Sequence, residues 1–290
     1  MTKAQQLSMI EMPKMRNARM VLGFSGWMDG GEVSTGSVEY LITKLGAWKF
    51  AEIDPYDFYI SSVPGSMENV ARYRPVTTIA DGFVREFQFP ENAFFADEEN
   101  NIIFFVGKEP NLKWDAYAQC IFSLAADLDV TTIYTIGSFA GLVPHTRQPR
   151  ITATVSDPKT KAMLGHYGVK FTTYHGPSHI ATYLIWLAKK RGISMASLVA
   201  EIPAYVEGKN PKCMDTTAKL LCALLEIHVD LDDLLDLSDE VERKLNNMVG
   251  QRPELLELIQ KLELDYDNEV FDTEMGDLKV WLEQRGLRLD

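Results

Sequence analysis

The chain has 290 residues, 46% of them hydrophobic and 24% charged, a composition that is ordinary for one or two globular domains. It contains no long uncharged apolar run and no apolar core near its start, so we expect neither a transmembrane helix nor a secretory signal. Three cysteines without CxxC spacing fit a reducing cytoplasm and argue against a disulfide framework or a metal site, and a net charge of -12 argues against nucleic-acid binding, which needs a basic face.

Short apolar runs alternate with helical patterns up to about residue 205. Strands are predicted at residues 19–24, 57–62, 83–89, 101–107, 130–137 and 150–156, and the apolar stretch at residues 198–205 closes this part of the chain. Helices are predicted at residues 33–46, 111–128, 158–168 and 178–192. This alternation predicts an α/β domain with a central mixed, mostly parallel sheet that is flanked by helices.

Residues with capping chemistry mark the ends of these predicted helices. Gly46 is expected to end the first helix, and Asn111 is placed to cap the second. Asp157 precedes Pro158, a combination typical of a helix start. Ser178 follows a Gly-Pro turn and is expected to cap the helix at residues 178–192.

From about residue 210 the strand patterns stop and the chain becomes helical and acidic. Helices are predicted at residues 213–231, 238–251, 253–264 and 272–286, with Ser238 and Asp272 as caps. Residues 226–290 hold 19 acidic and 7 basic side chains, whereas the first 225 residues hold 22 of each. We therefore expect an α/β domain at residues 1–207 and an acidic helical extension at 208–290. The acidic extension is either a solvated surface or a docking surface for a basic partner.

The stretch "GFSGWMDGG", residues 23–31, joins the first predicted strand to the first predicted helix. Open α/β sheets bind ligands at such carboxyl ends of strands, which makes Gly26, Trp27 and Asp29 candidate ligand-binding residues. The glycine spacing matches neither a P-loop nor GxGxxG, and the Asp29 carboxylate would repel a phosphate. The alternative interpretation is a tight structural turn with Trp27 packed beneath it.

A second candidate is the stretch "GSFAGLVPHTRQPR", residues 137–150, which follows another predicted strand. It brings together His145, Thr146 and Arg147 between two prolines. An arginine offers a planar fork for a carboxylate or phosphate, and a histidine can move a proton near neutral pH. The alternative is an interface or a loop-locking role in which Arg147 pairs with an acidic residue.

Two further motifs give weaker evidence for a functional site. In "YHGPSHI", residues 174–180, a proline separates the two histidines, so the stretch lacks the helical spacing of a zinc site. Tyr174 of the same stretch is a candidate ligand contact. In "PAYVEGKNP", residues 203–211, Tyr205 and Glu207 either line a cleft or belong to a packed linker.

These four motifs, in this order, resemble those of the proteasome assembly chaperone 2 family in its long bacterial form, which carries a helical C-terminal extension. The resemblance covers about residues 15–220. It implies a fold similar to that of purine nucleoside phosphorylases and a homo-oligomer, with a trimer favoured. Eukaryotic and archaeal members of that family act as chaperones or adaptors that bind proteasome components.

Two functional hypotheses follow. The first is a non-catalytic, oligomeric assembly chaperone or scaffold that presents its acidic helical extension to a protein partner. The second is a binding protein or enzyme for an anion or nucleoside-like molecule, with a site built from Gly26, Trp27, Asp29, His145, Thr146, Arg147 and Tyr174. No catalytic residue is assigned, no cofactor is expected, and whether the chain is an enzyme stays open.

Overall fold

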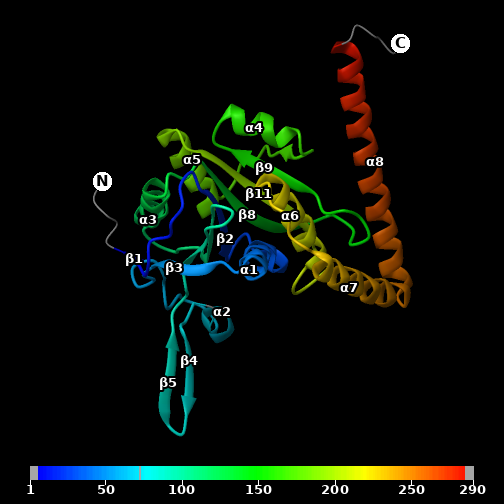
Figure 1. Ribbon diagram of the computed structural model, residues 1–290. Coiled ribbons are helices and arrows are strands. Elements are labelled where there is room, and N and C mark those ends of the chain that lie inside the picture. The colour runs from blue at the N-terminus through cyan, green and yellow to red at the C-terminus, as the bar shows by residue number, and fades with distance from the viewer. Residues whose placement is uncertain (1–5, 72, 285–290) are drawn as a thin grey trace.

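A nine-stranded mixed sheet forms the centre of the computed structural model, which describes residues 6–71 and 73–284 (Figure 1). The strands are β1 (Leu7–Met9), β2 (Arg19–Ser25), β3 (Trp48–Ile53), β4 (Val76–Ala80), β5 (Phe83–Gln88), β6 (Ala93–Asp97), β7 (Ile102–Lys108), β8 (Thr132–Gly141), β9 (Ile151–Val155), β10 (Lys170–Phe171) and β11 (Ser194–Pro203). Their order in the sheet is β1-β3-β6-β7-β2-β8-β11-β9-β10, while β4 and β5 pair only with each other. The central strands β7, β2, β8 and β11 are parallel, and antiparallel pairs flank them. The predicted α/β fold with a mixed sheet is confirmed.

Helices cover both faces of this sheet. They are α1 (Val33–Leu45), α2 (Met67–Ala71), α3 (Trp114–Asp127), α4 (Pro158–Gly165), α5 (Ile180–Arg191), α6 (Pro211–Leu224), α7 (Asp232–Gly250) and α8 (Pro253–Gln284), with a short 3-10 turn at Gly30–Glu32. Successive side chains of β2 point to opposite faces, so Met20 and Leu22 pack with α3 and α5, whereas Val21 packs with α1 and α6. The central strands are therefore buried on both sides, as their continuous apolar sequences require.

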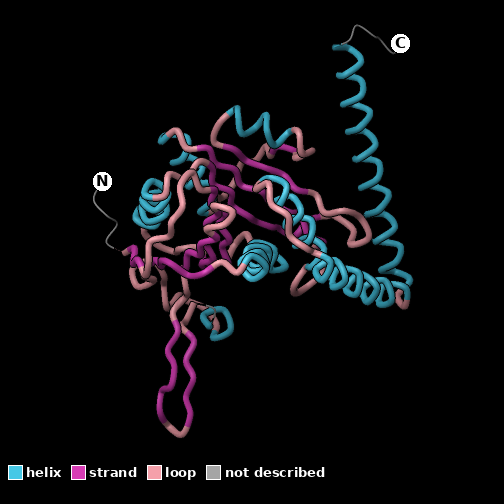
Figure 2. The backbone as a smooth tube through the Cα atoms, in the orientation of Figure 1, coloured by secondary structure: helices cyan, strands magenta, loops and turns pink. Residues whose placement is uncertain are grey.

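Two elements project from the body of the molecule, one at each side (Figure 2). The hairpin formed by β4 and β5 extends away from the main sheet (Figure 1). On the other side, α7 leads to the 32-residue helix α8, which is about 48 Å long at 1.5 Å per residue. We call α7 and α8 together the helical arm.

Several local predictions were wrong for identifiable reasons. Residues 57–62 do not form a strand, because Phe58 is fully buried as an anchor and the loop around it turns. Asn111 does not cap α3, since its side-chain oxygen accepts a hydrogen bond from the backbone N–H of Ile60 at 3.1 Å. The strand predicted at residues 83–89 exists as β5, but it lies in the projecting hairpin. The predicted caps Gly46 and Asp157 are confirmed.

The helical part also differs from its prediction in detail. Ser238 is not a cap, because it lies buried inside α7. The helices predicted at residues 253–264 and 272–286 are one continuous helix, α8, and residues 285–290 lie outside the described part. Helix α6 packs against α1 and β11, so it belongs spatially to the body. The domain boundary at residue 207 stays a prediction.

Candidate functional site

The glycine-rich loop between β2 and α1 is held by its own aspartate. The Asp29 carboxylate accepts hydrogen bonds from the backbone N–H and the hydroxyl of Thr35, at 3.1 and 2.7 Å. Burial raises the pKa of Asp29, an effect that these hydrogen bonds oppose. The carboxylate thus satisfies a backbone N–H at the start of α1, where an anionic ligand would otherwise bind.

Glu109, which directly follows β7, likewise accepts hydrogen bonds from two backbone N–H groups. One carboxylate oxygen accepts from the N–H of Trp27 at 3.3 Å, and the other accepts from the N–H of Ile180 at 2.8 Å. The glycine loop and the start of α5 are therefore joined by a carboxylate of the chain itself. The predicted cap Ser178 is wrong, since its hydroxyl donates to the carbonyl of His179. No sequence motif singles out Glu109, although an acidic residue directly after an apolar strand is a candidate for contacts with the loops at that edge of the sheet.

The other candidate residues of these loops face solvent or serve the backbone. Trp27 is 70% exposed and Tyr174 is 67% exposed, so the prediction that Trp27 packs beneath the loop was wrong. The Tyr174 hydroxyl donates to the carbonyl of Pro177 at 3.1 Å. Gly26 has a φ of 129°, and a Cβ at this position would lie 3.2 Å from the Cβ of Glu109. Glycine therefore allows Glu109 to approach the loop.

Replacing Glu109 with alanine is expected to free the backbone N–H groups of Trp27 and Ile180 and to lower the free energy of unfolding by about 1 kcal/mol, as loss of a helix cap does. Thermal unfolding and amide exchange at Ile180 measure the effect. Glu109→Gln keeps one acceptor oxygen and is expected to lose less. If the alanine and glutamine variants unfold at the same temperature, the carboxylate does not hold these two elements together.

His145 is a buried connector between three parts of the chain. Its backbone N–H donates to the Tyr205 hydroxyl oxygen at 2.8 Å, and its Nδ1 lies 2.7 Å from the same oxygen. The hydroxyl therefore donates its proton to Nδ1, and Nε2–H donates to the Asn246 side-chain oxygen of α7 at 3.2 Å. Burial lowers the pKa of His145, which keeps the ring neutral at pH 7. Both ring nitrogens are occupied, so neither is available to a substrate.

Arg147 and Thr146 bind acidic side chains of α8. The Arg147 guanidinium forms a bidentate pair with Asp267, with N–O distances of 2.8 and 2.7 Å, and its third nitrogen lies 3.4 Å from Glu263. The hydroxyl of Thr146 donates to Glu263. Hydrogen bonding from Arg147 lowers the pKa of Asp267. This is the arrangement that the loop-locking interpretation predicts.

Further contacts on both sides of Arg147 join the same loop to the body and the arm. Arg150 lies 2.9 Å from Glu269, and its guanidinium stacks 4.4 Å from the ring of Tyr266. Lys212 of α6 donates to the carbonyl of His145 at 2.7 Å and to Glu242 of α7 at 2.6 Å. We call residues 143–150 with these contacts to α7 and α8 the clasp. It turns the loop into the attachment point of the helical arm.

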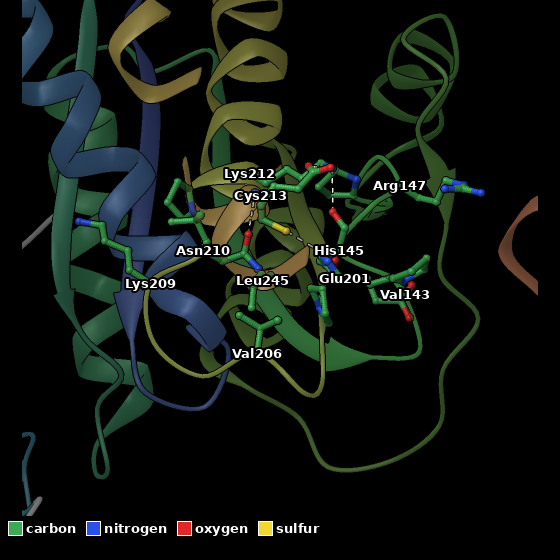
Figure 3. Close-up of a pocket in the computed structure, with 16 residues that line it drawn as sticks. Val143, His145, Arg147, Glu201, Val206, Lys209, Asn210, Lys212, Cys213 and Leu245 are labelled. Carbon is green, nitrogen blue, oxygen red and sulfur yellow. Dashed lines mark hydrogen bonds and ion pairs between the residues drawn. The ribbon is translucent and has the colours of Figure 1, made fainter. Parts of the chain in front are cut away.

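Beneath the clasp is a cavity of about 30 Å³, which has room for about two water molecules. It is lined in part by His145, Glu201, Asn210 and Lys212, while the Arg147 side chain points away from His145 and Lys212 (Figure 3). A nucleoside does not fit in this volume. The described residues contain no group of three or more histidine, cysteine, aspartate or glutamate side chains that could hold a metal ion.

The predicted site residues do not converge on one cleft. Asp29 lies beside Ser138 of β8, whereas His145, Thr146 and Arg147 lie under the helical arm. A larger opening of about 750 Å³ lies between α1 and the base of the hairpin, and none of the seven predicted residues lines it. Within the described ranges, no helix has the length and apolarity that spanning a membrane would require.

Comparison with known proteins fits this architecture. A proteasome-assembly chaperone homologue from Mycobacterium tuberculosis has 25% identity and a TM-score of 0.72, covering 83% of this chain and 99% of that one. A PAC2 family protein from Streptomyces avermitilis has 23% identity and a TM-score of 0.70, with coverage of 83% and 99%. An archaeal proteasome activator from Pyrococcus furiosus has 19% identity and a TM-score of 0.60, with coverage of 83% and 97%. No curated protein sequence matches the chain. The model of the PAC2 family matches residues 23–249, and the chain therefore belongs to the PAC2 family.

Proposed function

We propose that this chain is a non-catalytic, oligomeric scaffold of the assembly-chaperone type, and that its helical arm contacts a protein partner. The observation that carries the proposal is that the polar side chains of the two candidate loops are used for contacts within the chain. Asp29, His145 and Arg147 all bind groups of the chain itself. Family membership supports the proposal, because similar folds include a proteasome-assembly chaperone homologue and an archaeal proteasome activator.

The helical arm has the chemistry of a contact surface. Ile259 of α8 is buried, whereas Leu256, Leu258 and Leu264 are 39%, 63% and 61% exposed. Acidic residues surround these leucines, since the arm carries the chain's excess negative charge. A helix with exposed leucines between carboxylates fits an apolar groove with a basic rim on a partner protein.

A cross-linking experiment tests this proposal. A photo-reactive amino acid placed at Leu258 or Leu264 of the full chain is expected to capture a partner in extracts of the source organism. The same probe at Trp186 of α5, which is 51% exposed on the body, is expected not to. The captured protein, once identified and purified, should bind the wild-type chain and lose binding to the Leu258→Asp variant. Equal capture at all three positions, or unchanged binding of the variant, contradicts the proposal.

The second candidate function, binding of an anion or a nucleoside-like molecule, is favoured only by the opening of about 750 Å³ at the ends of β2 and β7. That volume is within the range of small-molecule sites. A thermal-shift series with phosphate, nucleosides and nucleotides separates the two hypotheses. A ligand at 100 times its dissociation constant would stabilise the chain by about 2.7 kcal/mol, and the scaffold proposal expects no shift with any of them.

A further inference from the structure

One face of the projecting hairpin is mainly apolar. Across the two strands, Thr77 lies opposite Phe87 and Ile79 lies opposite Val84, so these four side chains share a face. Ile79, Val84 and Phe87 are 63%, 63% and 60% exposed. The opposite face is mixed. It carries Val76 and Phe83, which are 64% and 65% exposed, and on it Thr78 and Gln88 both donate hydrogen bonds to the Glu86 carboxylate. We call Thr77, Ile79, Val84 and Phe87 the hairpin face.

The hairpin face continues into the body as a row of aromatic rings. The ring of Phe87 lies 5.4 Å from that of Phe89, which in turn lies 4.7 Å from the ring of Tyr56. A two-stranded hairpin is marginally stable in water, and long exposed apolar strands readily associate. Soluble monomers rarely expose an apolar face of this length. We therefore expect another surface to cover the hairpin face in the assembled protein.

The body carries a second exposed apolar surface at the carboxyl ends of the central strands. It consists of Trp27, Phe139, Leu142 and Tyr174, which are 70%, 42%, 76% and 67% exposed, and we call it the edge patch. Hydrogen bonds hold its loops together. The N–H of Ser138 donates to the carbonyl of Met28 at 2.8 Å, and Glu109 joins the N–H groups of Trp27 and Ile180. The loops that carry Trp27 and Phe139 are thus held against each other.

The accessible area and the charge both indicate a second copy of the chain as the occupant. The chain exposes 16734 Å², whereas a compact monomer of its mass of 32.8 kDa would expose about 12,500 Å², and the hairpin and the helical arm both contribute to this excess. With ~100 Å² for each side chain of this exposure, the hairpin face and edge patch together bury roughly 800 Å² of side chain, and the surrounding backbone brings the contact to about 1,000 Å², the lower limit of a specific interface. Both surfaces lie in the first 225 residues, which have no net charge, so two copies meet there without repulsion.

We infer that the hairpin face of one copy docks on the edge patch of the next copy. Because the two surfaces differ, the contact is head-to-tail, and repetition around an axis closes it into a ring. A symmetric contact between two hairpins would leave the edge patch uncovered. The inference rests on the oligomeric scaffold proposed above, and it names the surfaces that build the oligomer.

Three single variants of the full chain test the inference by light scattering after size-exclusion chromatography. Phe87→Asp disables the hairpin face, and Leu142→Asp disables the edge patch. Thr78→Asp places the same charge on the opposite face of the hairpin, beside Glu86, as a control. Wild type and Thr78→Asp are expected to be oligomers, and the other two are expected to be monomers. Circular dichroism establishes that each variant is folded.

Mixing the two monomeric variants gives the decisive result. In a head-to-tail contact, the intact hairpin of the Leu142→Asp chain docks on the intact edge patch of the Phe87→Asp chain, so a species of twice the 32.8 kDa chain mass is expected. A monomeric wild type, an oligomeric Phe87→Asp or Leu142→Asp variant, or a mixture that stays monomeric overturns the inference. Cross-linking at Leu258 and Leu264 tests the contact between the arm and its partner separately, so that part of the proposed function does not depend on this outcome.

Discussion

Replacing Arg147 with glutamate is expected to release α8 from the clasp. The substitution removes the bidentate pair with Asp267 and places a negative charge beside both Asp267 and Glu263. Because the pair is partly solvated, its loss alone has a small effect, and the added repulsion makes most of the difference. We expect backbone amides of residues 253–269 to exchange about tenfold faster, while the sheet amides stay protected. Hydrogen-exchange mass spectrometry measures both.

Two further variants control this experiment. Arg16→Glu reverses an ion pair of 2.8 Å with Asp129 on the body, and it is expected to leave exchange in the arm unchanged. Adding Asp267→Arg to Arg147→Glu restores an opposite pair and should recover much of the protection. If Arg147→Glu exchanges like wild type, the clasp does not hold the arm.

Replacing Gly23 with alanine is expected to lower the free energy of unfolding by about 1–3 kcal/mol, the range for overpacked cores. An added Cβ would lie 2.8 Å from the carbonyl oxygen of Ser34 and 3.0 Å from Cγ2 of Val38. Helix α1 cannot move away easily, because the Ser34 hydroxyl donates to the carbonyl of Ile136 at 2.6 Å and accepts from the N–H of Phe24 at 3.0 Å. Gly23 thus permits the close approach of α1 to β2.

Thermal unfolding measures this effect, and Gly165→Ala provides the matched control. A Cβ at Gly165 would have no atom within 4 Å, so that substitution is expected to be neutral or to stabilise the chain by up to ~1 kcal/mol. A Gly23→Ala chain that melts at the same temperature as Gly165→Ala would show that the helix is not held against the strand by this contact.

The sequence predicted the central strands because they are buried on both faces and their apolar runs are continuous. It could not place β5, since an amphipathic strand looks the same whether it joins the main sheet or a separate hairpin. It also could not name the partner of Arg147, because Asp267 is 120 residues away and α8 offers many acids. Caps failed where a distant side chain competed, as Glu109 does at the start of α5.

The clasp also sets an order of events during synthesis on the ribosome. The sheet cannot be completed before β11, which ends at Pro203, has emerged, because β11 pairs with both β8 and β9. The carboxylates of α8 that bind Arg147 and Arg150 come still later, at residues 263–269, although Arg150 also lies 3.7 Å from Glu201 of β11. Domains form as their segments become available, so the arm is the last part to attach. A nascent chain that pauses before α8 presents Arg147 to any acidic surface nearby, including ribosomal RNA, until its own helix arrives.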